Sequence, residues 1–262
     1  VYFGSTHDDT RALTIDALTR EVRAAYPTLE VREAYTSRIV RRRLRDRGVE
    51  TSAPLEVLKQ LKADGFTHLV IQSANIIEGV EMEALRREVA SVAADFKEVR
   101  IGTPLLYMPE DYAAVIRALA PAPAEGAADV WVGHGSYDPA TAQYAMLGYM
   151  LAAEGRARCF VTTIEGYPTL DDLRAKLKQN GAKSVTLRPF MFVAGDHAKN
   201  DIATDMKQEL EKEGYRVNVL LEGLGQSDAI RALYLAHIRF ALNHRMFDIL
   251  SKKKHYETND RD

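Results

Sequence analysis

The sequence predicts an α/β fold of two pseudo-symmetric halves, each a mostly parallel sheet flanked by helices, with an active-site cleft between the halves. Strand-like and helix-like stretches alternate along the chain, and this alternation is typical of parallel sheets. Residues 120–129 are rich in Pro, Ala and Gly and lack periodicity, as expected of a linker near the middle of the chain. Segments on either side of this linker also align with each other.

The predicted strands are short apolar runs, and the predicted helices carry apolar residues at three- and four-residue spacing. The strands are expected at residues 1–3, 31–35, 68–72, 99–101, 130–133, 159–164, 184–191 and 217–221. The helices are expected at residues 10–25, 55–63, 82–94, 140–153, 170–179, 201–213 and 229–244. We therefore expect an N-terminal α/β half at 1–122, a C-terminal α/β half at 129–250 and a charged tail at 251–262.

An internal duplication is the simplest explanation of the two halves. Residues 1–9 align with residues 130–138 at an offset of 129, and residues 61–79 align with residues 177–195 at an offset of 116. The aligned glycine pairs are Gly4 with Gly133, Gly65 with Gly181 and Gly79 with Gly195. The change of offset locates an extra basic segment in the first half, near residues 38–53. The alternative is the loose similarity that any two βαβ runs share.

Composition limits the classes of function. The chain has 262 residues, 46% of them hydrophobic, which is enough for a sizeable core in one or two domains. A net charge of −2 argues against a general nucleic-acid binder, and no apolar run approaches the ~18 residues that span a bilayer. The single cysteine, Cys159, excludes an internal disulfide framework and is expected to be a small apolar strand residue.

The expected location is the cytoplasm. A reducing compartment fits the single cysteine. The first expected strand begins at Val1 itself, so a preceding signal peptide and a periplasmic location stay open.

Three candidate metal ligands follow three strands of the second half. His134 follows residues 130–133, Glu165 follows residues 159–164, and His197 follows residues 184–191 through a short turn. Ligands of open parallel sheets bind beyond the carboxyl ends of the strands. Two imidazoles and a carboxylate suit a divalent transition metal that keeps open coordination positions. We therefore predict that all three bind metal and that His134 and Glu165 are also catalytic.

Each ligand also has a structural interpretation when it is taken singly. A lone histidine at a strand end more often makes surface hydrogen bonds, and Glu165 could simply favour the start of a helix. The alignment of the halves pairs the three ligands with Ser5, Thr36 and Glu81. Their joint placement, rather than any one residue, therefore favours metal binding.

The basic segment is the candidate for binding an acidic substrate. Guanidinium groups pair with carboxylates, so Arg38, Arg42 and Arg45 are predicted substrate contacts, together with Lys199. Glu81 is predicted to relay protons or to steer cations in the same site. A solvated helix and an exposed acid at a helix start are the alternatives.

Several motifs resemble the anaerobic sirohydrochlorin cobaltochelatases (CbiK-like), which are class II chelatases. They include "GHG" at 133–135, "IEGYP" at 164–168 and "VAGDHAKNDI" at 193–202. The last of these is fairly specific, whereas "GHG" alone is a weak signal. The resemblance runs almost end to end, through "FGST" at 3–6, "AYTSRIVRRRL" at 34–44, "IQSANIIEG" at 71–79, "GTPLL" at 102–106 and "GLGQSDAIRALYLAH" at 223–237. One departure is Asn75, which stands where relatives commonly have histidine.

The resemblance implies insertion of Co²⁺ into sirohydrochlorin, with release of two protons, in anaerobic cobalamin biosynthesis. It also implies that His134, Glu165 and His197 bind the metal. Fe²⁺ or Ni²⁺ as the metal substrate, a related tetrapyrrole, and a non-catalytic tetrapyrrole or metal carrier are the alternatives. A phosphatase-like hydrolase that uses His134 ranks last, because the chain lacks a paired nucleophile motif. We expect no nucleotide, nucleic acid or membrane partner, and a homo-oligomer stays open.

Overall fold

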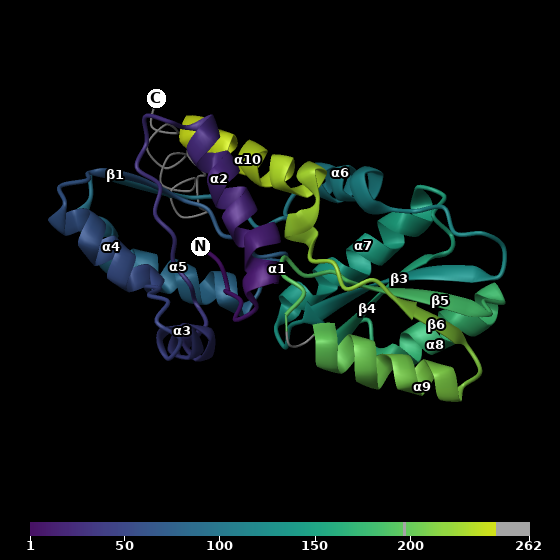
Figure 1. Cartoon of the computed structure of the whole chain (residues 1–262). Coiled ribbons are helices and arrows are strands. Elements are labelled where there is room, and N and C mark those ends of the chain that lie inside the picture. The colour runs from purple at the N-terminus through teal and green to yellow at the C-terminus, as the bar shows by residue number, and fades with distance from the viewer. Residues whose placement is uncertain (196–197, 245–262) are drawn as a thin grey trace, which may run out of the picture.

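Parallel sheets flanked by helices form the whole fold (Figure 1). A computed structural model describes residues 1–195 and 198–244. It contains a four-stranded sheet in the order β4-β3-β5-β6 and a two-stranded sheet of β1 and β2, and all of the strand pairs are parallel. The predicted α/β class is therefore confirmed. No helix among the described residues is both long and apolar enough to cross a bilayer.

The C-terminal sheet is the more complete of the two. Its strands are β3 (Ala127–Gly135), β4 (Cys159–Glu165), β5 (Ser184–Pro189) and β6 (Arg216–Val219). One face packs on α8 (Leu170–Asn180), the π-helical segment η3 (Ala198–Met206) and α9 (Lys207–Lys212). The other face packs on α6 (Pro109–Leu119) and α7 (Ala142–Ala153), which follows η2 (Pro139–Thr141). Cover on both faces explains why these strands are apolar along most of their length.

The strands predicted for the C-terminal half overlap the four strands of this sheet. Cys159 is buried in β4, as its predicted strand role requires, and burial raises the pKa of its thiol to about 11. The expected linker at 120–129 ends earlier than predicted, because β3 begins at Ala127 and pairs there with Ser184 of β5.

The N-terminal half has fewer regular strands than predicted. Only β1 (His68–Ile71) and β2 (Glu98–Ile101) form a ladder, while residues 1–3 and 31–35 are joined by a single parallel bridge from Tyr2 to Tyr35. The Tyr2 amide donates to the Ala34 carbonyl, and the Ala74 amide donates to the Val1 carbonyl, each at 2.9 Å. The spatial order is therefore residues 34–37, residues 1–3, β1, β2, which is the order of β4-β3-β5-β6. This shared order supports the duplication inferred from the sequence.

The helices of this half differ from prediction, because the expected helix at 10–25 is divided and the helices at residues 38–45 and 109–119 were not among the expected ones. The expected helix at 10–25 is two helices, α1 (Asp8–Leu13) and α2 (Ile15–Ala25), which meet at Thr14. The Thr14 hydroxyl donates to the Thr10 carbonyl at 2.6 Å, and the Thr14 backbone leaves helical geometry. The remaining elements are α3 (Arg38–Arg45), α4 (Pro54–Ala63), α5 (Val80–Val92) and η1 (Ala93–Asp95).

Two helices cross between the halves. The last helix, α10 (Asp228–Asn243), follows η4 (Leu224–Gln226) and lies along the N-terminal half (Figure 1). Arg100 of β2 donates to the carbonyls of Ala241 and Leu242. In the opposite direction, α6 of the first half packs on α7 and β3. We propose that the halves divide at 1–122 and 129–250 and that each half is completed by a helix of the other. The predicted charged tail at 251–262 lies outside the described residues.

A hydrogen bond between His237 and Asp111 joins the two crossing helices. His237 of α10 donates from Nε2 to the Asp111 carboxylate at 3.0 Å, and the Met108 amide at the start of α6 donates to the same carboxylate at 2.7 Å. Burial opposes ionisation of Asp111, but these hydrogen bonds outweigh it and hold its pKa below the ordinary value of 3.8. The pair therefore stabilises the ionised form, which is the form present at neutral pH.

We expect Asp111→Ala to lower the free energy of unfolding by about 2–3 kcal/mol at pH 7, since hydrogen bonds to charged groups contribute about 1.5–3 kcal/mol. A group whose folded pKa is depressed stabilises the fold above its unfolded pKa and loses this effect as pH falls through its folded pKa. Urea unfolding of both proteins at pH 7 and at about pH 3 measures the difference. A difference that did not shrink at the lower pH would contradict this role.

Candidate active site

A cleft of about 530 Å³ lies between the halves, at the carboxyl ends of β3 and β4. The N-terminal half contributes residues from the stretches 2–7, 37–43 and 74–81. The C-terminal half contributes residues 134–137, Glu165 and residues from 191–195. The size is in the range of small-molecule sites, and the position is the one expected for an open parallel sheet.

His134 and Glu165 end two neighbouring strands on one wall of this cleft. Gly135 and Glu165 are paired across β3 and β4, so His134 lies beside the end of β4. Both side chains are half-buried and line the cleft, and His134 Nδ1 lies 3.4 Å from the Gly135 carbonyl oxygen. The structure therefore brings together two of the three predicted ligands.

Gly135 makes this close approach of the strands feasible. Its φ is +96°, and a Cβ atom added there would lie 1.3 Å from the Glu165 carbonyl oxygen. Only glycine fits both the left-handed backbone and the space beside Glu165. The glycine after His134 thus sets how closely the two candidate ligands approach.

The third predicted ligand, His197, lies outside the described residues. Its nearest described neighbours are Gly195, which lines the cleft, and Ala198, which is buried at the start of η3. Within residues 1–195 and 198–244, no group of three His, Cys, Asp or Glu side chains is close enough to hold a metal ion. The full set of His134, Glu165 and His197 therefore stays a prediction.

The opposite wall of the cleft differs from what the sequence alignment predicts. The Ala74 amide bonds to the Val1 carbonyl as the Phe190 amide bonds to the Val132 carbonyl, so Val1 is the counterpart of Val132. Gly4 then matches Gly135, and both have a φ near +100°. The offset is 131 rather than 129, which makes Phe3 the counterpart of His134.

The comparison of backbone pairing in the two halves also assigns the counterpart of Glu165. Tyr2 pairs with Tyr35 as Gly133 pairs with Thr163, so Ser37 rather than Thr36 is the counterpart of Glu165. Glu81, the predicted counterpart of His197, lines the cleft as an exposed residue at the start of α5. The facing wall thus has an aromatic ring and a hydroxyl where the C-terminal wall has an imidazole and a carboxylate.

Large apolar side chains surround the cleft and remain partly exposed. The exposed fractions are 46% for Phe3, 57% for Ile39, 47% for Val80 and 82% for Tyr137. Such a group of exposed apolar residues in a concave site indicates a ligand with apolar faces. The sequence analysis missed these residues, because apolar residues at strand ends look like core residues until the register is known.

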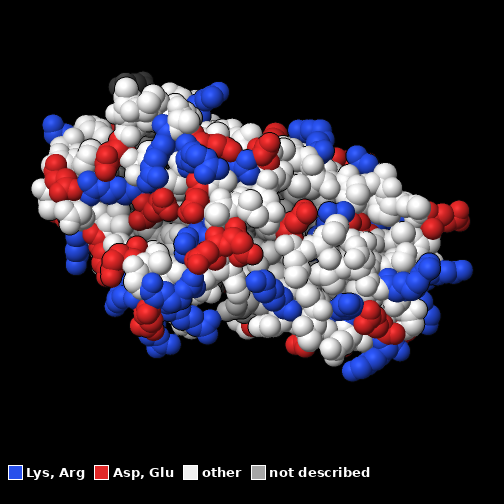
Figure 2. All heavy atoms as spheres, viewed as in Figure 1, with Lys and Arg blue, Asp and Glu red and all other residues white. Residues whose placement is uncertain are grey.

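Helix α3 directs only some of its arginines to the cleft. Ile39 and Arg43 line the cleft, while Leu44 is buried beneath the helix. The predicted substrate contacts Arg38, Arg42 and Arg45 are exposed, lie at i, i+4 and i+7, and form a neighbouring stripe that does not line the cleft. Figure 2 shows Lys and Arg side chains gathered over α3 at the lower left. Arg43 is therefore the arginine of α3 nearest to a bound ligand.

Comparison with known proteins shows the family. A model of the family "Cobalt chelatase (CbiK)" matches residues 1–243. The chain is 38% identical over 251 residues to the sirohydrochlorin cobaltochelatase of Salmonella typhimurium, covering 93% of this chain and 95% of that protein. The chain belongs to the cobalt chelatase (CbiK) family. It is also 32% identical to the sirohydrochlorin cobaltochelatase CbiKC of Nitratidesulfovibrio vulgaris, covering 88% of this chain and 85% of that protein.

Solved structures share the fold of this cobalt chelatase family member. SirB from Bacillus subtilis with Fe³⁺ superposes with a TM-score of 0.65 at 16% identity, covering 92% of this chain and 94% of that one. The sirohydrochlorin chelatase SirB of Bacillus subtilis subspecies spizizenii in complex with cobalt gives a TM-score of 0.56 at 14% identity, covering 92% and 93%. At these identities the likeness concerns the fold alone, and it agrees with the two-half architecture.

Two further residues of the family member border the cleft. Lys199, at the start of η3, lies 3.3 Å from His7 Nδ1, so side chains of the two halves meet at the edge of the cleft. Asn75 lines the cleft, and its carbonyl accepts from the Leu105 amide and the Tyr234 hydroxyl. These backbone contacts fix the loop independently of the side chain at position 75.

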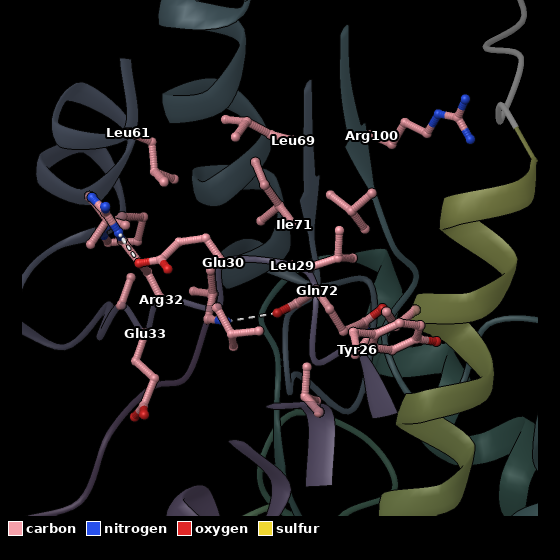
Figure 3. A pocket seen from close by; sticks show the side chains of 18 of the residues that line it. Tyr26, Leu29, Glu30, Arg32, Glu33, Leu61, Leu69, Ile71, Gln72 and Arg100 are labelled. Carbon is pink, nitrogen blue, oxygen red and sulfur yellow. Dashed lines mark hydrogen bonds and ion pairs between the residues drawn. The ribbon is translucent and has the colours of Figure 1, made fainter. Parts of the chain in front are cut away.

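A second cavity of about 520 Å³ lies inside the N-terminal half (Figure 3). It is bordered by residues 28–34 and by 68–72, and Arg32 pairs with Glu30 at its edge. None of the predicted site residues lines this cavity.

Proposed function

We propose that this chain inserts Co²⁺ into sirohydrochlorin. Membership of the cobalt chelatase family over residues 1–243 supports the reaction, and two relatives named sirohydrochlorin cobaltochelatase support the substrate. The observation that carries the proposal to particular atoms is the placement of His134 and Glu165 side by side on one wall of the cleft.

The wall that carries His134 and Glu165 holds the incoming metal. A neutral imidazole and a carboxylate bind a divalent cation without closing its coordination sphere, so the ion can still be passed to the macrocycle. His197 is the proposed third ligand. The imidazoles must be neutral to bind metal, so the activity should fall in acid.

The reaction releases two protons for each metal ion that enters the ring. Two pyrrole N–H bonds break, the four ring nitrogens bind the Co²⁺ ion, and both protons must leave the cleft. Glu81 on the facing wall is the proposed acceptor, because it is a carboxylate within the cleft on the side away from the metal wall. Phe3, Ile39 and Val80 offer an apolar surface against which a flat ring packs.

Arg43 is the proposed contact for a substrate carboxylate, with Lys199 at the cleft edge as a second. The stripe of Arg38, Arg42 and Arg45 lies farther out, where its charge attracts an anionic substrate. We expect Arg43→Gln to raise the KM for sirohydrochlorin by about tenfold, since a charge-assisted hydrogen bond contributes about 1.5–3 kcal/mol, and to leave the KM for Co²⁺ nearly unchanged. Arg45→Gln is the matched control. A larger effect of Arg45→Gln would move the contact to the stripe.

Insertion kinetics test the proposed function. The purified protein is given sirohydrochlorin with Co²⁺, Fe²⁺ or Ni²⁺ in parallel, and the absorption spectrum of the macrocycle reports insertion. Turnover with Co²⁺ is expected. Turnover with Fe²⁺ alone would identify a ferrochelatase, and spectral binding without metal-dependent turnover would identify a carrier. A cytoplasmic location and a homo-oligomer remain predictions from the sequence.

A further inference from the structure

We propose that a third cavity, bordered by Arg188, binds a small zwitterion with an apolar body, the chemistry of an apolar amino acid. This Arg188 pocket has a volume of about 330 Å³, which is within the range of small-molecule sites. It lies where the end of α6 and residues from the stretch 220–227 approach the end of β5. It shares no lining residue with the cleft, so the inference is independent of the proposed insertion reaction.

A buried carboxylate holds Arg188 in place. Trp131 pairs with Arg188 across β3 and β5, and side chains alternate along a strand, so Asp129, Trp131 and Arg188 lie on the same face of the sheet. Asp129 is only 3% exposed, and its two oxygens accept from Trp131 Nε1 at 2.9 Å and from Arg188 Nε at 2.6 Å. Nη1 and Nη2 of Arg188 make no hydrogen bond to any described residue, so this end of the guanidinium is available to a ligand carboxylate.

Glu222 supplies the opposite charge. Its exposed side chain lines the same pocket, and within the described part of the chain it forms no ion pair with Arg188 or with any other residue. A simple anion would be attracted by Arg188 but repelled by Glu222. A ligand that carries both a carboxylate and an ammonium group is attracted by both side chains.

The remaining walls of the Arg188 pocket are apolar and fixed. The rings of Trp131 and Phe190 are stacked with their centroids 5.2 Å apart, and both line the pocket. The amides of Leu220 and Leu224 donate to carbonyls of β5 and of the loop that follows it, so the wall opposite the rings is already formed. The leucines that line the pocket are Leu119, Leu220 and Leu224. These walls suit an apolar side chain on the ligand.

L-leucine and two analogues test the chemistry of the ligand by calorimetry. L-leucinamide lacks the carboxylate and should bind about tenfold more weakly, because charge-assisted bonds to a held guanidinium are strong. N-acetyl-L-leucine lacks the ammonium group and should bind about two- to fivefold more weakly, because ion pairs with an exposed carboxylate are weaker. No binding of L-leucine, or equal binding of the three compounds, would overturn the proposal.

Two variants assign these preferences to the two side chains. In Arg188→Lys an ammonium group still neutralises Asp129, but the fork is lost, so L-leucine should bind no better than L-leucinamide. In Glu222→Gln, which changes an exposed residue, L-leucine and N-acetyl-L-leucine should bind equally. Arg216→Lys is the matched control, since Arg216 is exposed on β6 and lines neither the Arg188 pocket nor the cleft.

Competition with sirohydrochlorin separates the Arg188 pocket from the cleft. The affinity for L-leucine should stay within about twofold when sirohydrochlorin is present, because sites without shared residues act nearly independently. Displacement of L-leucine by sirohydrochlorin would contradict a separate site. Discrimination among the three compounds that persisted unchanged in both Arg188→Lys and Glu222→Gln would also overturn the proposal.

Discussion

His134→Ala is expected to lower cobalt insertion by at least about 100-fold while the protein stays folded. The variant loses a proposed metal ligand, and the loss of even an outer partner of a metal ligand typically costs about 10–100-fold in metal affinity or activity. His134 lies at the strand end beside Glu165, half-buried in the cleft wall. The measurement is the initial rate of insertion at saturating sirohydrochlorin, with circular dichroism as the check on folding.

His68→Ala is the matched control for this variant. His68 is exposed at the start of β1 and borders the cavity inside the N-terminal half rather than the cleft. Its replacement should leave the insertion rate within about twofold. A His134→Ala protein that inserted Co²⁺ as fast as the His68→Ala protein would show that the imidazole at the end of β3 takes no part.

Gly135→Ala is expected to have the largest effect on stability, lowering the free energy of unfolding by roughly 2–5 kcal/mol. The added methyl group would overlap the Glu165 carbonyl oxygen, so β3 and β4 would have to separate at their carboxyl ends. Left-handed backbone in a non-glycine residue adds about 1–2 kcal/mol, and overpacking adds about 1–3 kcal/mol. Insertion activity should fall too, because the separation displaces Glu165 from His134.

Gly155→Ala isolates the backbone contribution. Gly155 follows α7, has a φ of +76°, and has open space where a Cβ would stand. Its alanine variant should lose only about 1–2 kcal/mol and keep its activity. Urea unfolding of both variants gives the comparison. Equal losses at the two positions would mean that the contact with Glu165 does not constrain the site.

The C-terminal half was the easier half to predict from the sequence. Its strands are long and apolar because helices cover both faces of the sheet, so continuous apolar runs in the sequence identified them. Residues 1–3 and 31–35 have the same composition but make only one bridge. The break at Thr14 depends on a hydroxyl that bonds back to Thr10, which hydrophobic periodicity does not register.

The chemical asymmetry of the cleft was predicted only in part. The sequence alignment of the two halves made Ser5 the counterpart of His134. The backbone hydrogen bonds shift this alignment by two residues and make Phe3 the counterpart instead. The face that α3 presents to the cleft likewise depends on which side of the helix packs on the core. The sequence analysis therefore predicted the stripe of Arg38, Arg42 and Arg45 as substrate contacts, whereas Arg43 is the arginine that lines the cleft.

The consequence of the corrected register is a cleft with two different walls. One wall carries the groups that bind a cation, and the facing wall carries a ring, a hydroxyl and the Glu81 carboxylate. A flat macrocycle between them meets the metal on one face and an apolar surface on the other. The duplication therefore supplies the shape of the cleft, and the divergence of its halves supplies the chemistry.

Anomalous diffraction from crystals soaked in Co²⁺ tests this account most directly. The account predicts a peak in the cleft about 2.0–2.2 Å from a nitrogen of His134 and an oxygen of Glu165, the range found for imidazole and carboxylate ligands of Zn²⁺. It also predicts that the peak is lost in His134→Ala crystals. A cobalt ion bound elsewhere, with both side chains beyond its coordination sphere, would contradict it.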